Sequence, residues 1–218
     1  MDQENPWIKL FEQKGWLWVH DGNPKRPHAL LTEGGHSNGY FDATSLTKTP
    51  NLLGAACFDL VAICKDQSIV LESIDYSDSV FGSAYGAIFI AYEIARLSEC
   101  RVGYTVPQII DGKKAMTVPR RFKIEPGQKV IVVEDVMTTG GTTQKTIAAL
   151  EEKGAVPLPV VLVIVNRSGK ADLEGRRVIG LIEKEMPVWA PDECPLCKQG
   201  SEAIRPKGNW DKLTAEYK

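Results

Sequence analysis

The sequence lacks long hydrophobic runs. Its longest uninterrupted apolar segments, such as Val160–Val165, fall far short of the roughly 18 residues that a membrane-spanning helix requires. The N-terminal residues are acidic and polar, whereas a signal peptide begins with basic residues and continues with apolar ones. We therefore expect no transmembrane helix, no signal peptide and no membrane partner, and we expect a cytoplasmic location.

An excess of charge of one sign is also missing. The chain has 218 residues, of which 26 are basic and 28 acidic, so its formal net charge is −2. No long Lys/Arg block is present, and affinity for a nucleic-acid backbone requires a basic surface. We therefore expect that nucleic acid is not a partner.

Cysteines are few, odd in number and scattered, at Cys57, Cys64, Cys100, Cys194 and Cys197. This usage is typical of a reducing cytosol rather than of a disulfide framework. The motif Cys194-Pro-Leu-Cys197 is half of a zinc knuckle, but a structural zinc ion needs four ligands and no second cysteine pair is present. None of the three histidines shows ligand spacing with a cysteine. Two interpretations stay open, a zinc site or the packing of small apolar thiols.

Strand-like and helix-like segments alternate along the chain. The clearest unit is an apolar strand over Gln128–Val133, then a polar loop, then a helix that ends at Lys153 and is closed by Gly154. The other predicted elements are a helix within Trp7–Trp18, a buried helix over Asn51–Lys65 with Asn51 as its N-cap, a strand at Ser79–Phe81, a helix over Ala87–Leu97, and strands at Val160–Val165 and Val178–Ile182. This order predicts an α/β fold with an open, mostly parallel sheet flanked by helices.

The residues after Val133 carry the strongest functional signal, because ligands of open α/β sheets bind beyond the carboxyl ends of the strands. Two carboxylates, Glu134 and Asp135, precede the hydroxyl- and glycine-rich stretch Thr138–Thr143 at a predicted helix start. Free backbone N–H groups and the helix dipole favour a bound phosphate there. The spacing is neither that of a P-loop nor that of a dinucleotide site, which disfavours nucleoside triphosphates and nicotinamide cofactors. An ordinary helix cap is the structural alternative.

The segment Val130–Thr142 resembles the motif that binds 5-phosphoribosyl 1-pyrophosphate (PRPP) in type I phosphoribosyltransferases. The resemblance implies that Glu134 and Asp135 bind the ribose hydroxyls and that Thr138–Thr142 hold the 5-phosphate. The loop Gly82–Gly86 is similar to the pyrophosphate-binding loop of that family. The PRPP-binding residues that this implies are Glu134, Asp135, Val136, Met137, Thr138, Thr139, Gly140, Gly141, Thr142, Ser83, Ala84, Tyr85 and Gly86.

Further segments are similar to the orotate phosphoribosyltransferases within that family. Leu31–Asp42 resembles their N-terminal hood, Asn166–Gly169 resembles a turn whose arginine holds orotate, and Cys194–Gly200 resembles the C-terminus of one branch. The base-binding residues that this implies are Arg167, Thr138, Ser37 and Tyr40. The chain would divide into an N-terminal helix and hood (1–50), a phosphoribosyltransferase core (51–190) and a C-terminal tail (191–218).

The resemblance implies an Mg²⁺-dependent enzyme that joins orotate to PRPP, giving orotidine 5′-monophosphate and pyrophosphate, and that works as a homodimer. Mg²⁺ would be held mainly through PRPP and water, with no direct protein ligand. The implied catalytic residues are Glu134, Asp135, Lys113, Lys114 and Arg120. The basic residues, together with Arg121, would neutralise the leaving pyrophosphate, supplied across a dimer interface.

Three features depart from the orotate pattern. The mobile loop of those enzymes carries a histidine, and the stretch Tyr104–Gly127 has none. The pyrophosphate loop lacks the usual lysine at Tyr85 or Gly86, and Asn166 stands where aspartate is usual. Two alternatives therefore stay open, a phosphoribosyltransferase for a purine or another base and a non-catalytic regulator that senses PRPP.

Overall fold

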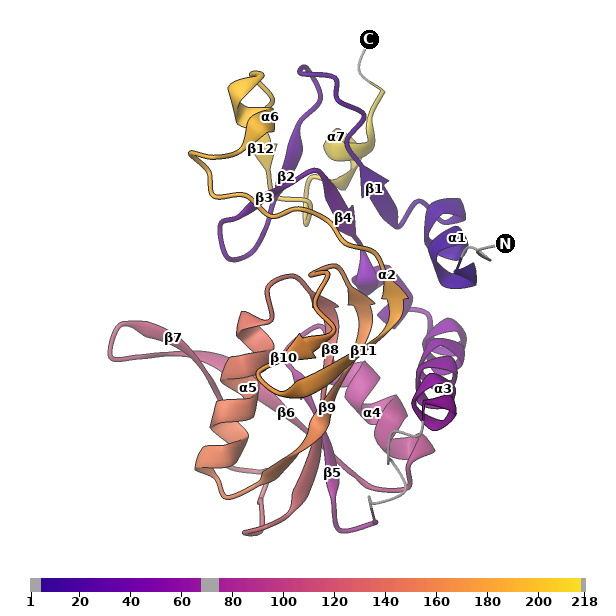
Figure 1. Ribbon diagram of the computed structural model, residues 1–218, viewed down its shortest axis with the longest axis vertical. Coiled ribbons are helices and arrows are strands. Elements are labelled where there is room, and N and C mark those ends of the chain that lie inside the picture. The colour runs from indigo at the N-terminus through magenta and orange to yellow at the C-terminus, as the bar shows by residue number, and fades with distance from the viewer. Residues whose placement is uncertain (1–4, 68–74, 217–218) are drawn as a thin grey trace. The chain divides into compact units, whose positions relative to one another are not determined.

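A computed structural model describes residues 5–67 and 75–216, which form two compact units (Figure 1). The larger unit spans residues 43–184, and the smaller one combines residues up to 42 with those from 185 onward. Among the described residues, no helix combines the length and apolar character that crossing a bilayer requires.

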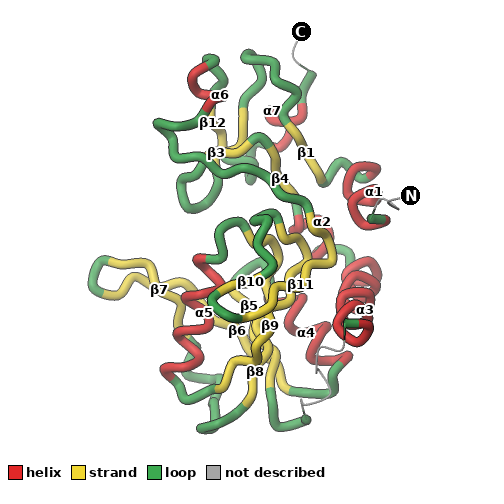
Figure 2. Tube along the Cα trace, viewed as in Figure 1, coloured by secondary structure: helices red, strands yellow, loops and turns green. Residues whose placement is uncertain are grey.

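The larger unit is built on a seven-stranded sheet in the order β10-β11-β9-β8-β5-β6-β7. Its elements are α2 (Ala43–Thr47), α3 (Pro50–Asp66), β5 (Ser79–Ser83), α4 (Ile88–Leu97), β6 (Arg101–Ile110), β7 (Lys113–Thr117), β8 (Lys129–Met137), α5 (Gly141–Glu152), β9 (Val156–Asn166), β10 (Asp172–Leu173) and β11 (Arg176–Glu183). The inner strands run parallel, and only the edge strands β10 and β7 are antiparallel to their neighbours. Figure 2 shows α5 on one face of this sheet and α3 and α4 on the other. The predicted α/β fold is confirmed.

The centre of the sheet is its most buried part. Val130–Val133 of β8 are at most 1% exposed and Val160–Val165 of β9 at most 3%. Both runs are continuously apolar because helices cover both faces of a parallel sheet. The strands predicted over these two runs are therefore confirmed.

Two helix boundaries show how local chemistry sets an element's start. The predicted N-cap of α3, Asn51, is wrong, since the helix begins at Pro50 with Thr49 in the cap position. Proline suits the first helical position because it has no N–H to leave unpaired and its φ is already helical. α5 begins after Gly140, which has φ +88°, and Gly154 follows its end with φ +86°, as the sequence predicts for a C-terminal glycine.

The basic stretch between Tyr104 and Gly127 is not simply a loop, as the sequence suggested. Most of it forms the β6–β7 hairpin, which extends away from the sheet in Figure 1. Its two-residue turn is Asp111-Gly112, with φ of +49° and +74°. Aspartate and glycine tolerate positive φ at both positions, which allows the tightest hairpin connection. Lys113 and Lys114 consequently lie on β7.

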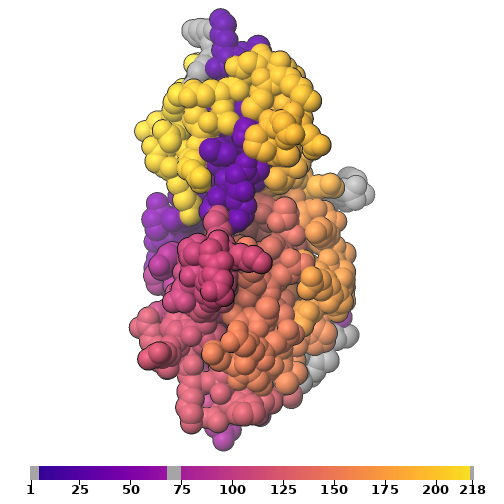
Figure 3. Space-filling model, turned by 90° about the vertical axis from the view of Figure 1, so that its left-hand side faces the viewer, coloured from indigo at the N-terminus to yellow at the C-terminus, as the bar shows by residue number. Residues whose placement is uncertain are grey.

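The smaller unit joins both ends of the described chain. Its elements are α1 (Pro6–Gln13), β1 (Leu17–Val19), β2 (His28–Leu30), β3 (His36–Ser37), β4 (Gly39–Phe41), α6 (Pro195–Lys198), β12 (Ala203–Ile204) and α7 (Trp210–Thr214). β1 pairs with β4, and β2 lies between β12 and β3. Ile204 and Leu213 pack with Trp18 and Ala29 in one apolar cluster. The stretch from residue 191 that the sequence indicated as a tail is thus part of this unit's sheet and core, and Figure 3 shows the indigo and yellow segments in contact.

Candidate active site

The acidic pair lies inside strand β8 rather than in a loop after it, because the strand continues to Met137. Successive side chains of a strand point to opposite faces. Glu134 is accordingly buried, at 6% exposure, whereas Asp135 is partly exposed. The two carboxylates that the sequence placed together therefore have different surroundings.

Glu134 is the end point of a buried chain of hydroxyl groups. Its Oε2 accepts hydrogen bonds from Ser83 Oγ at 2.9 Å and from Thr143 Oγ1 at 3.3 Å. Thr146 Oγ1 lies 3.3 Å from Ser83 Oγ and 2.8 Å from Thr105 Oγ1. These contacts connect β5, β6, β8 and α5 at the carboxyl end of the sheet.

The surroundings of Glu134 disfavour its charged form. Burial raises the pKa of Glu134 well above its ordinary value, and the neighbouring Asp135 carboxylate raises it further. The hydrogen bond from Ser83 opposes this shift without cancelling it. The fold therefore keeps the Glu134 carboxyl group buried, although its charged form would be more stable in water.

Asp135 faces the loop that follows β5. A Cβ atom added at Gly86 would lie 2.0 Å from Asp135 Oδ2, so only glycine permits this approach. Asp135 Oδ1 also accepts a hydrogen bond from the backbone N–H of Val136 at 2.8 Å. The acidic pair and the predicted pyrophosphate loop are thereby brought together.

That loop, Ser83–Gly86, lies between β5 and α4. The Ala84 N–H donates to the Thr105 carbonyl at 2.9 Å, and the peptide bond between Ala84 and Tyr85 is cis. Ser83 is buried, with its hydroxyl on Glu134, whereas Tyr85 is 75% exposed. Of the loop's side chains, Tyr85 is the one that faces solvent, and Ser83 belongs to the hydroxyl chain.

The predicted phosphate loop bends between β8 and α5. Thr138–Gly140 form the bend, and the first intrahelical bond runs from the Gln144 N–H to the Gly140 carbonyl at 2.9 Å. The first N–H groups of a helix have no intrahelical partner, and the helix dipole places positive charge there. Thr139 is exposed and Thr138 and Thr142 are partly exposed, so this edge is open to a phosphate group.

Arg167 follows β9 directly and is 1% exposed. Arg167 is therefore a buried side chain and not a surface arginine. Its backbone N–H donates to the Met137 carbonyl at 3.0 Å, which ties it to the end of β8. Asn166 forms the turn that follows, since its side-chain oxygen accepts from the Ser168 N–H at 3.1 Å.

Two of the basic candidates, Lys114 and Arg121, have neighbours other than the acidic pair. Lys114 lines a hollow together with Ala149, Glu152 and Lys153, in the last turns of α5, whereas the phosphate loop precedes its first turn. Arg121 lies 5.2 Å above the Tyr104 ring and donates a hydrogen bond to the Tyr104 hydroxyl. Lys113 and Arg120 are exposed.

Ser37 and Tyr40, predicted to bind the base, belong to the smaller unit. Ser37 Oγ donates to the Pro187 carbonyl at 2.7 Å, and the Tyr40 ring packs 5.8 Å from that of Trp210. Sequence reasoning missed Thr105 and Thr146, and it placed Thr143 in the phosphate stretch rather than beside Glu134. Thr143 and Thr146 are one helical turn apart, a spacing that places two hydroxyls on the same face of α5.

Known proteins resemble this chain in sequence and in fold. The phosphoribosyl transferase domain family matches residues 65–195. Orotate phosphoribosyltransferases of Caldicellulosiruptor bescii and Caldicellulosiruptor saccharolyticus are 37% and 39% identical, each over 82% of this chain and 87% of the relative. The crystal structure of orotate phosphoribosyltransferase from Aeropyrum pernix aligns with a TM-score of 0.60 and 23% identity, covering 80% of this chain and 92% of that one. That structural likeness supports the fold.

Replacing Glu134 by Gln is expected to stabilise the protein at mildly alkaline pH. A raised folded-state pKa means that the unfolded chain releases this proton at lower pH, so wild-type stability falls as pH rises through that interval. The amide keeps the hydrogen bonds, because the Ser83 and Thr143 hydroxyls can turn to accept. Each kcal/mol gained raises the melting temperature by roughly 2–4 °C. Thermal unfolding from about pH 5 to pH 8 measures this gain, which should shrink toward acid pH.

Exposed Glu152, on the last turn of α5, provides the control, since Glu152→Gln should not change the pH dependence. A Glu134→Gln variant that is less stable than wild type at pH 8 would contradict the buried-carboxyl interpretation.

Gly140 and Gly141 form a matched pair for testing the phosphate loop. Gly140→Ala should cost roughly 1–3 kcal/mol, because φ is +88° and the new Cβ would lie 2.5 Å from Leu173 Cδ1. Gly141→Ala should leave the free energy of unfolding unchanged or raise it by up to about 1 kcal/mol. The nearest atom to the new Cβ is 3.7 Å away, and alanine is favoured over glycine at a helical position. Urea unfolding measures both, and equal effects would rule out this loop conformation.

Proposed function

The chain belongs to the orotate phosphoribosyltransferase family, and we propose that it joins orotate to PRPP, giving orotidine 5′-monophosphate and pyrophosphate. One observation carries the proposal. The acidic strand end of β8, the glycine-threonine loop before α5 and the arginine after β9 all lie at the carboxyl edge of one parallel sheet, where Met137 pairs with Asn166. That edge is where open α/β sheets bind ligands.

We propose that the ribose 5-phosphate part of PRPP binds along this edge. The partly exposed Asp135 carboxylate can accept hydrogen bonds from ribose hydroxyls, and the stretch from Thr138 to Thr142 supplies backbone and hydroxyl donors to the 5-phosphate. Val136 and Met137 shape the strand end beneath the sugar. The pyrophosphate would lie toward Ala84–Gly86, next to Asp135.

Glu134 supports a different role from Asp135. Its carboxyl is already engaged by Ser83 and Thr143, which lie at the start of the pyrophosphate loop and in the first turn of α5. We therefore propose that Glu134 is first a positioning residue that fixes both loops. A direct contact with the ribose remains a prediction from the sequence.

The chemistry requires positioning and charge stabilisation. As the C1–O bond to pyrophosphate lengthens, the ribose centre becomes oxocarbenium-like and negative charge collects on the leaving group. Lys113, Lys114 and Arg120 are the cationic candidates, and they lie on the hairpin and the turn after it. We propose that a second copy of the chain delivers them. Exposed Phe58, Phe89 and Tyr92 on the adjacent helices α3 and α4 support a homodimer.

Mg²⁺ fits the donors at this edge. The partly exposed Asp135 carboxylate makes the edge favourable to a hard cation that keeps several waters and is held mainly through PRPP. We propose that Mg²⁺ enters with PRPP and that, when bound, it neutralises charge on the pyrophosphate. None of the five cysteines, all of which lie in the described residues, forms a disulfide, which supports the proposed cytoplasmic location.

Arg167 is the proposed determinant of the base. Orotate differs from uracil by a carboxylate, and a guanidinium offers that group two parallel N–H donors. Burial strengthens the attraction because the surroundings screen charge less than water does. Thr138, at the facing strand end, is the second candidate within the larger unit.

Asp135→Asn is expected to reduce turnover at least about tenfold with folding intact, because hydrogen bonds to a charged group contribute about 1.5–3 kcal/mol. Steady-state pyrophosphate release with PRPP, Mg²⁺ and orotate measures it. Asp172→Asn, at an exposed position on β10, is the control and should match wild type. Unchanged kinetics for Asp135→Asn would remove the ribose assignment.

The base is tested by pyrophosphate release across orotate, uracil, adenine, guanine and hypoxanthine. Orotate alone should support turnover. Arg167→Ala should weaken orotate binding by roughly 2–4 kcal/mol, as for a buried charge pair that loses one partner, while PRPP binding changes little. Arg177→Ala, at an exposed arginine on β11, is the matched control. Turnover with a purine would favour the other-base alternative, and PRPP binding without turnover on any base would favour the regulator.

A further inference from the structure

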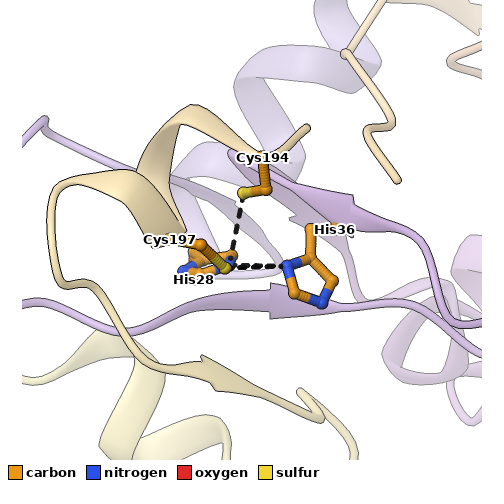
Figure 4. Close-up of side chains that lie close together, drawn as sticks. All are labelled: His28, His36, Cys194 and Cys197. Carbon is orange, nitrogen blue, oxygen red and sulfur yellow. Dashed lines mark hydrogen bonds between the residues drawn. The ribbon is translucent and has the colours of Figure 1, made fainter. Parts of the chain in front are cut away.

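Four side chains with metal-binding atoms converge in the smaller unit. They are His28, His36, Cys194 and Cys197, and one ligand atom of each lies within 4.8 Å of all the others. Figure 4 shows them pointing toward one another from three separate segments. His28 and Cys194 are fully buried, and His36 is 7% exposed.

The fold, rather than the local sequence, assembles this group. β2 and β3 form an antiparallel pair in which Leu30 faces His36, so His28 and His36 are diagonal neighbours on one face. Cys194 and Cys197 flank the first turn of α6, and β12, which follows, pairs with β2 beside His28. His36 and Cys197 are 161 positions apart in the sequence.

The distances between the ligand atoms are close to those expected for four ligands around one central ion. His28 Nε2 lies 3.1 Å from His36 Nδ1 and 3.5 Å from each cysteine Sγ, and His36 Nδ1 lies 3.2 Å from Cys197 Sγ. With Zn–N near 2.0–2.1 Å and Zn–S near 2.3 Å, tetrahedral ligands lie about 3.3–3.8 Å from one another. If the ligand atoms moved outward by a few tenths of an ångström, their separations would match those around a central zinc ion.

A neighbouring serine orients His28 as a metal ligand requires. Ser201 Oγ donates its single proton to the Arg26 carbonyl at 2.6 Å. The 2.8 Å contact between Ser201 Oγ and His28 Nδ1 must then use a proton on the histidine. Nε2 therefore presents its lone pair to the other three side chains. Metal-bound histidines characteristically donate their second ring N–H to such a partner.

We propose that His28, His36, Cys194 and Cys197 bind one structural zinc ion. Two thiolates and two imidazoles form a tetrahedral set typical of zinc, and neither sulfur nor nitrogen suits Mg²⁺. With all four positions supplied by the protein, no site remains for a substrate or a reactive water. The ion would join the β2–β3 hairpin to α6, and so stabilise contacts between the two ends of the chain. This proposal is independent of the transferase activity.

The first test measures metal in the full-length wild-type protein. After purification without chelator or affinity metal, elemental analysis should find about one zinc per chain. After zinc removal, Co²⁺ should produce the visible absorption of a tetrahedral ion together with a thiolate-to-cobalt charge-transfer band. Wild-type protein with no bound zinc and no such spectrum would overturn the proposal, whatever the variants do.

The second test assigns the ligands. Cys197→Ser and His36→Asn should lower the zinc content at least about tenfold, and a chelator should lower the melting temperature of wild type but not of these variants. Cys100→Ser and His20→Asn, which alter residues outside the cluster, should keep the metal. Full zinc content in both ligand variants, or a Cys194–Cys197 disulfide in place of the ion, would contradict the site.

Discussion

The buried carboxyl of Glu134 is the constraint around which the carboxyl edge of the sheet is organised. A carboxyl group at 6% exposure has lost most of its hydration, so it needs donors from the protein. Ser83 and Thr143 provide them. Ser83 begins the loop that would hold pyrophosphate, and Thr143 lies in the first turn of α5, directly after the loop that would hold the 5-phosphate. The hydrogen bonds to this buried carboxyl group thus fix the two loops relative to strand β8, although burying the group lowers the stability of the protein. A buried carboxyl group with a raised pKa beside a ligand-binding edge is typical of functional residues.

Much of this arrangement can be predicted from the sequence because its signals are local. A continuous apolar run indicates a strand covered on both faces, and an acidic pair followed by glycines and threonines indicates a ligand edge. What the sequence could not show is which carboxylate faces inward. Strand alternation requires that Glu134 and Asp135 differ, but the direction depends on the position of α5 and its Thr143, which only the tertiary structure provides.

Three features escaped sequence reasoning for identifiable reasons. The β6–β7 hairpin was hidden because β7 is only five residues long and begins with two exposed lysines, so it lacks the apolar alternation that indicates a strand. The burial of Arg167 depends on packing around the end of β9, not on its neighbours in sequence. The histidine–cysteine cluster was missed because its partners lie on segments as much as 169 positions apart, whereas zinc motifs are recognised by short spacing.

The proposed PRPP site at the sheet edge and the histidine–cysteine cluster offer different ligand atoms to a metal ion. Each is therefore expected to bind a different kind of metal ion. The sheet edge presents carboxylate and hydroxyl oxygens that are partly open to water, which suits a weakly held cation that arrives with its substrate and leaves with the product. The histidine–cysteine cluster presents nitrogen and sulfur from a nearly closed set, which suits an ion that stays bound. Because Mg²⁺ binds thiolates and imidazoles poorly, even a large excess of it would leave the cluster to zinc. Under the two proposals, the chain would exchange one metal ion at every turnover while keeping another as part of its fold.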